Sequence, residues 1–122
     1  MSTQITARTE PDMGVVPRIS YMAALSLAET IISESTVIPS SFVIEVLEHA
    51  PTEPVIRFYF HRNPAAVREF ADECWMGVTT ETRADGSVFT EARGTDRRGV
   101  LVTAWSLMPA SAIVAVADEV AA

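Results

Sequence analysis

Lysine is absent from this chain, and cysteine and histidine are scarce. The single cysteine, Cys74, excludes an intramolecular disulfide. The two histidines, His49 and His61, show none of the H-x-E, H-x-H or H-E-x-x-H spacings that typify metal sites. The sequence therefore provides no recognisable set of metal ligands, and we expect no cofactor.

The motifs of catalysis are missing as well. The chain has no Gly-x-Ser-x-Gly elbow, no phosphate-binding loop and no dinucleotide fingerprint. The acid pairs Asp72-Glu73 and Asp118-Glu119 are neighbours on predicted helices, so their side chains diverge instead of forming an acid–base dyad. Cys74 falls on an apolar helical stripe, which favours a packed core thiol over a nucleophile. The sequence favours a protein that is not an enzyme.

The charge balance is acidic, with 16 acids against 9 bases and a net charge of −7. This balance disfavours non-specific contact with nucleic acid or anionic lipid. The only basic cluster, Asp96-Arg97-Arg98, is most simply a charged turn. Residues 1–19 lack a secretory signal pattern, and no run approaches the roughly 20 apolar residues of a membrane span. We expect a cytoplasmic protein without a nucleic-acid or membrane partner.

The length of 122 residues and the apolar content of 48% fit one globular domain. Residues 1–18 lack periodicity and predict a flexible tail, which leaves 19–122 as the domain. Ser20 is the predicted N-cap of a first helix that ends before Pro39. The predicted buried stripe of this helix is Tyr21, Leu25, Ala28 and Ile32.

Two strands and a second helix follow. Residues 42–47 and 55–60 are β-branched and aromatic runs, separated by a loop (49–54) whose two prolines should prevent a ladder. Asn63 and Pro64 predict the start of the second helix, and Gly77 is its predicted left-handed C-cap. The predicted core positions are Ile56, Phe58 and Phe60 on the strand, and Val67, Phe70, Ala71 and Cys74 on the helix.

Asp85-Gly86 marks a hairpin turn with two possible registers. A two-residue loop would mix Val78 with charged residues on one face. A three-residue loop, Ala84-Asp85-Gly86 with Gly86 left-handed, separates a drier face from a charged one, and we prefer it for that reason. The charged face then carries Thr79, Glu81, Arg83, Phe89, Glu91 and Arg93.

The strand at residues 100–107 is apolar on both faces, which predicts a position inside the sheet. Residues 109–122 predict a last helix, with Ile113, Val116, Ala117 and Val120 facing inward. The fold class is therefore α+β, with a mostly antiparallel sheet of about five strands, packed helices and the element order αββαβββα.

The segments Phe60–Arg68, Ala84–Ser87 and Val102–Leu107 resemble small uncharacterised proteins of actinobacteria, their phages and integrated elements. The resemblance covers under half of the chain and implies no activity. The strand–helix–three-strand order is also similar to half of a vicinal-oxygen-chelate module, whose metal ligands are not recognisable here.

The candidate binding surface combines the solvent-facing side of the 55–60 strand with the charged face of the hairpin. Its residues are Arg57, Tyr59, His61, Glu81, Arg83, Phe89, Glu91 and Arg93. Mixed aromatic and charged composition suits a protein partner. The leading hypothesis is a non-catalytic interaction module that self-associates as a homo-oligomer such as a homodimer, as an accessory protein of a phage or mobile element. Two alternatives are a small-molecule-binding protein or minor enzyme with a pocket near His61, and an acidic decoy for a nucleic-acid-binding partner.

Overall fold

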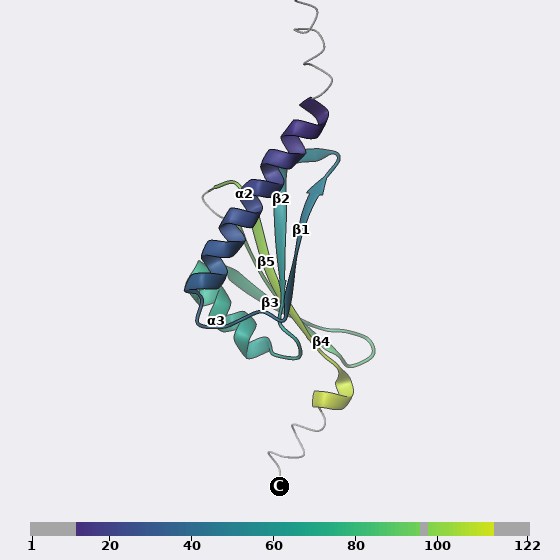
Figure 1. Cartoon of the computed structure of the whole chain (residues 1–122). Helices are drawn as coiled ribbons and strands as arrows, with labels where there is room; N and C mark the ends of the chain where they lie inside the picture. Colours follow the sequence, from purple (N-terminus) through teal and green to yellow (C-terminus); the bar gives the residue numbers. More distant parts are fainter. Residues whose placement is uncertain (1–11, 96–97, 114–122) are drawn as a thin grey trace, which may run out of the picture.

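The computed structural model describes residues 12–95 and 98–113 and has the predicted α+β architecture with the order αββαβββα (Figure 1). A last helical segment starts at Ala110 and is described as far as Ile113. The other elements, in chain order, are α2 (Asp12–Glu34), β1 (Ser41–Leu47), β2 (Ala50–Tyr59), α3 (Pro64–Cys74), β3 (Gly77–Thr82), β4 (Val88–Thr95) and β5 (Leu101–Met108).

The five strands form one sheet in the order β1-β2-β5-β4-β3. Its pairings are antiparallel except for β2 with β5, which run parallel, so the sheet is mixed. The chain makes this parallel pair by crossing from β2 through α3 and the β3–β4 hairpin before β5 inserts between β2 and β4. The interior position predicted for the last strand is confirmed, and it explains why both faces of that strand are apolar.

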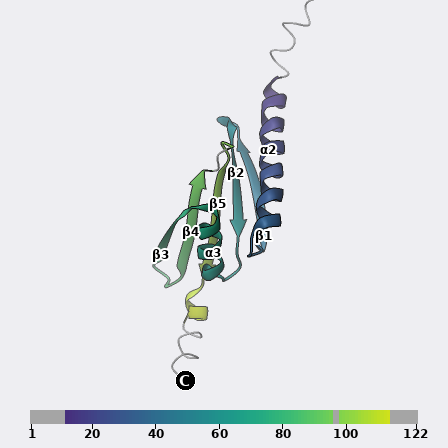
Figure 2. The same ribbon diagram turned by 90° about the vertical axis from the view of Figure 1, so that its left-hand side faces the viewer.

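Both helices pack on the same face of the sheet, as Figures 1 and 2 show. Helix α2 covers the β1–β2 side, and α3 covers β4 and β5. Phe70 of α3 lies between two aromatic side chains, with its ring centroid 5.1 Å from Phe58 of β2 and 5.6 Å from Phe60, which directly follows β2. Leu27 of α2 extends this core, and the predicted core positions of β2 are all buried. Each large side chain removed from water contributes about 1.5–3 kcal/mol to folding.

Helix α3 begins as the sequence predicts. The Asn63 side chain accepts a hydrogen bond from the Ala66 N–H at 3.1 Å, and Pro64 is the first helical residue. The prediction that Gly77 is the left-handed C-cap of α3 is wrong. Trp75 takes the left-handed conformation instead, with φ 58°, and the Met76 N–H bonds back to the Ala71 carbonyl at 2.9 Å. Gly77 is the first residue of β3.

The hairpin register is confirmed. Thr82 pairs with Val88, and the Arg83 N–H donates to the Ser87 carbonyl at 2.8 Å, which leaves a three-residue loop. Gly86 in that loop has φ 88°, a conformation that costs glycine little. The loop length therefore decided which side chains share each face of β3 and β4.

Strand β2 begins earlier than predicted, because the expected loop at 49–54 is only the turn Glu48–His49. The two prolines, Pro51 and Pro54, lie within β2. They are tolerated because the β1–β2 register shifts between Glu45 and Leu47, so neither proline is a paired position. Pairing with β5 likewise starts only at Val55.

Helix α2 also begins earlier than predicted, so residues 12–18 of the expected tail are helical. Ser20 is no N-cap: it lies inside the helix, is buried, and donates through Oγ to the Pro51 carbonyl at 2.5 Å. The predicted stripe is partly wrong, because Tyr21 and Leu25 are 41% and 46% exposed. The fully buried apolar residues are Ala24, Leu27 and Ala28. The rest of the expected tail, 1–11, and the predicted C-terminal helix beyond Ile113 lie outside the described residues.

The segment Gly14–Glu34 is long and apolar enough to cross a membrane by length and composition, and an 18-residue window within it has a mean hydropathy of 1.3. No such segment was expected from the sequence. Only 22% of that window is buried, yet Ala24, Leu27 and Ala28 belong to the core cluster with β2 and α3. Helix α2 is thus part of the domain's core on one side and apolar on its outer side too.

Candidate functional site

The sheet face opposite α2 and α3, called here the helix-free face, gathers the predicted site residues. Cross-strand partners lie on the same face of a sheet. Tyr59 of β2 pairs with Trp105 of β5, which pairs in turn with Glu91 of β4, and Glu91 pairs with Thr79 of β3. Since Phe58 points into the core, these residues all point away from the helices.

A row of rings crosses this face. Trp105 stands in the middle, with its ring centroid 4.5 Å from Tyr59 and 6.0 Å from Phe89. The Tyr59 hydroxyl is 2.7 Å from His61 Nδ1 at one end. The Arg83 guanidinium carbon lies 4.8 Å from the Phe89 ring centroid at the other end. The row spans β2, β5 and β4 without a break, and its three central rings are partly exposed.

Charged side chains flank the aromatic row. Arg57 Nε lies 2.5 Å from Glu45 Oε1, and both side chains are about 40% exposed. Arg83 lies 3.8 Å from Glu81. Exposed pairs of this kind contribute at most about 1 kcal/mol to stability. Glu91 and Arg93 complete a set of three acids and three bases, so this face is balanced although the chain carries −7.

The centre of the face is sheltered without a helix above it. Thr103 of β5 is only 1% exposed, and its cross-strand partners are Arg57 and Arg93. Long arginine side chains cover apolar surface with their methylene groups while their guanidinium groups stay in water. Thr103 Oγ1 also donates to the Ile56 carbonyl at 3.4 Å, which satisfies its hydroxyl. The face therefore presents aromatic rings and guanidinium groups around a buried position at the centre of β5.

His61 and Arg62 form the junction between β2 and α3. The His61 N–H donates to Ser40 Oγ at 2.9 Å, and its ring faces the Tyr59 hydroxyl. Arg62 has φ 45°. Asn63 already occupies one N–H of the α3 N-terminus, and its own N–H donates to Ser106 Oγ at 2.8 Å. These contacts make the junction a structural link, with His61 at the edge of the helix-free face.

All eight predicted binding residues thus lie on the helix-free face or at its rim: Arg57, Tyr59, His61, Glu81, Arg83, Phe89, Glu91 and Arg93. Two residues of this face were not predicted: Trp105, the central ring, and Glu45, the partner of Arg57. Strand alternation places Trp105 opposite Ala104, but only the strand order β2-β5-β4 brings it between Tyr59 and Phe89. No local signal in the sequence gives that order.

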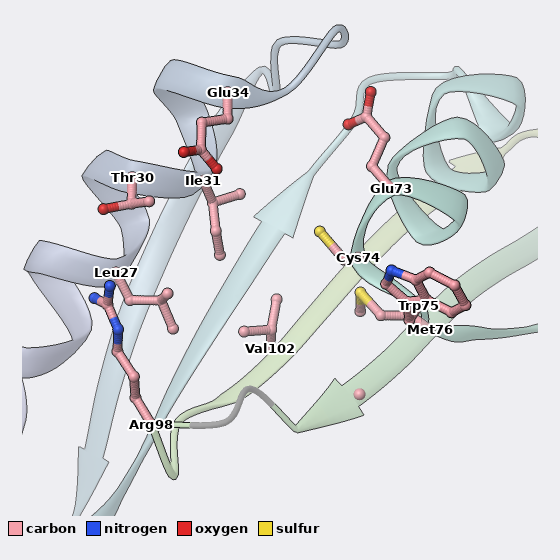
Figure 3. A pocket seen from close by; sticks show the side chains of 11 residues that line it. Leu27, Thr30, Ile31, Glu34, Glu73, Cys74, Trp75, Met76, Arg98 and Val102 are labelled. Carbon is pink, nitrogen blue, oxygen red and sulfur yellow. The ribbon is translucent and has the colours of Figure 1, made fainter.

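A separate hollow of about 260 Å³ lies on the helix side of the fold, between the C-terminal ends of α2 and α3 and the start of β5 (Figure 3). Cys74, Trp75 and Met76 line one side of it, and Glu34 and Arg98 lie on its other margins. Cys74 is partly buried against the core. A second, shallow groove runs between α2 and Phe42 of β1. Neither hollow is lined by His61.

Glu73, beside the first hollow, ties α3 to the loop after α2. Its carboxylate accepts hydrogen bonds from Ser35 Oγ at 2.7 Å, from the Thr36 N–H at 3.0 Å and from the Thr36 hydroxyl. The Thr36 hydroxyl is the main reason that the pKa of Glu73 is lowered, with Ser35 next. A carboxylate used in this way holds the two helices together and is not a candidate general base.

Within 12–95 and 98–113, no group of three or more His, Cys, Asp or Glu side chains is placed to hold a metal ion. Asp96 and Arg97 of the basic cluster lie outside the described residues, and Arg98 lines the hollow near Cys74. Comparison with models of protein families, with curated proteins and with solved structures gave no match.

Proposed function

We propose that this protein is a non-catalytic protein-interaction module and that its partner binds the helix-free face. The observation that carries the proposal is the row of rings from His61 through Tyr59, Trp105 and Phe89 to Arg83. Aromatic side chains and arginine are enriched in protein interfaces and dominate their hot spots.

The charge pattern favours a folded protein as the partner. Three acids and three bases alternate on the face, so it attracts a surface of mixed charge. Nucleic acid would require a basic surface. An acidic decoy would require acids repeated across one surface, whereas here Glu45 lies against Arg57 and Glu81 near Arg83.

A small-molecule site near His61 has weaker support. Ligand pockets are concave and bury most of their ligand. Neither of the two hollows is lined by residues of the helix-free face, and the described hydrogen bonds of the His61 junction go to Tyr59, Ser40 and Ser106. The sequence resemblance is the basis for proposing an accessory role in a phage or mobile element. The identity of the neighbouring genes tests this role.

Photo-crosslinking in the native host tests the interaction proposal. The photoreactive residue p-benzoylphenylalanine replaces Phe89 or Tyr59 on the helix-free face, and Asp72 on the exposed side of α3 in the control. We expect the two face positions to capture the same protein and the control position to capture none. If the α3 position captures that protein equally well, or if the face positions capture nothing, the proposal fails.

A further inference from the structure

Helix α2 exposes apolar side chains on the side turned away from the core. Ile19, Met22 and Leu25 are 63%, 61% and 46% exposed, and Val15 is 41% exposed. Figure 2 places α2 at the edge of the fold, beside β1. A helix that is apolar all round is normally covered on all sides. We therefore expect the outer side of α2 to be covered by something other than the described part of the chain.

The spacing of the outer residues indicates what that occupant is. Six residues follow one another at alternating steps of three and four along α2, which is the pattern of a helix packed lengthwise against another helix. We call them the α2 strip: Val15, Arg18, Met22, Leu25, Glu29 and Ile32, of which Ile32 is only partly exposed and also packs against the core. Phe42 of β1 borders the strip and forms the shallow groove with Met22, Leu25 and Ile32.

The α2 strip is complementary to itself when two copies run antiparallel. With the two-fold axis between Ala23 and Ala24, Met22 meets Leu25 of the other copy and Val15 meets Ile32. The same operation places Arg18 against Glu29 twice. Within the described residues neither Arg18 nor Glu29 forms a salt bridge in the single chain. A parallel pair would instead place like charges together, which is destabilising.

The size of the contact sets the expected affinity. Residues 15 to 32 span about 26 Å of helix at 1.5 Å per residue, and a helix with its side chains is about 10–12 Å wide. The projected contact is on the order of 300 Å², and Phe42 adds to its margin. Counted over both copies this is about 600 Å², below the roughly 1,000 Å² of a stable specific interface, so the contact is expected to be weak and transient. We therefore expect a micromolar dimer and not an obligate one.

We propose that a second copy of this chain occupies the α2 strip and forms a two-fold homodimer through antiparallel α2 helices. The contact lies on the helix side of the sheet and leaves the helix-free face accessible, so it does not depend on the proposed partner binding.

Charge reversal on the α2 strip tests this proposal by analytical ultracentrifugation of the full chain. We expect the wild type to shift from the 13.2 kDa monomer to a dimer as its concentration rises through the micromolar range. Arg18→Glu or Glu29→Arg alone should raise the dissociation constant of the dimer about tenfold or more, because each change creates two pairs of like charges across the two-fold axis. The double variant Arg18→Glu/Glu29→Arg should restore it, since the two pairs are only exchanged.

Asp72→Arg, a reversal on the exposed side of α3, is the matched control and should leave dimerisation unchanged. All these sites are exposed, so the variants should fold. The proposal is wrong if the wild type is a monomer at every concentration. It is also wrong if neither single charge reversal changes the dissociation constant of the dimer. Binding of the monomer to neutral phosphatidylcholine vesicles, lost in Met22→Asn, would also overturn it, because a lipid surface would then be the occupant.

Discussion

Trp75 presents the clearest conflict between local structure and stability in this fold. It is 92% exposed and has φ 58° at the end of α3. The left-handed conformation costs a residue with a Cβ roughly 1–2 kcal/mol. A tryptophan exposed to this degree keeps about 20 Å² out of water, which contributes about 0.5 kcal/mol at 25 cal/mol per Å². The backbone cost is therefore larger than the gain from the ring.

Trp75→Gly should consequently stabilise the domain by about 0.5 kcal/mol after glycine's extra entropy of unfolding is subtracted. Trp75→Ala is the matched variant, because it also removes the ring but keeps the Cβ at positive φ. We expect the free energy of unfolding of the glycine variant to be about 1 kcal/mol higher than that of the alanine variant, measured by urea unfolding followed by circular dichroism. If alanine is as stabilising as glycine or more so, the left-handed backbone at this position carries no strain. If both variants lose more than about 2 kcal/mol, the ring packs against the fold. Either result contradicts the prediction.

Two further predictions concern α3. The lowered pKa of Glu73 means that its stabilising effect is present above its ordinary value of 4.5 and is lost as the pH falls below it. Glu73→Gln should therefore lower the free energy of unfolding by less than about 1 kcal/mol at pH 7, because the carboxylate is exposed, and should not change it at a pH well below 4.5. Thermal unfolding of both proteins across this pH range measures the difference. A difference that does not change with pH would contradict the prediction. Asn63→Ala removes the cap on the Ala66 N–H and should cost about 1 kcal/mol in chemical unfolding, whereas Asn63→Asp should not.

The parts of the fold that the sequence predicted are those fixed by local chemistry. Asn63 and Pro64 specify the start of α3, and the alternation of apolar and charged residues on both sides of Gly86 selects the three-residue hairpin loop. The errors arose where the arrangement of neighbouring elements overrides local preference. Pro51 is acceptable in β2 because a register shift leaves it unpaired, and Gly77 already belongs to β3, so Trp75 takes the left-handed position at the end of α3. Both outcomes depend on neighbouring elements that no short stretch of sequence encodes.

Helix α2 was misread for a different reason. Its apolar residues surround the whole helix, so more than one stripe fits a period of 3.6 residues, and Leu25 looks as suitable for the core as Leu27. The candidate surface was predicted more fully, because alternation along β2 and β4 already separates Tyr59 and Phe89 from the core. Trp105 was missed as its centre because strand order is a property of the whole sheet.

The most direct test of the central claim is the affinity of the crosslinked partner for the helix-free face, measured by isothermal titration calorimetry. The variant Tyr59→Ala/Phe89→Ala removes the outer rings of the row and keeps Trp105 at its centre, and Asp72→Ala on α3 is the control. We predict binding at least about 30-fold weaker for the double variant, the equivalent of one hot spot of about 2 kcal/mol, with a folded circular dichroism spectrum. Unchanged affinity in the folded double variant would contradict the assignment of this face.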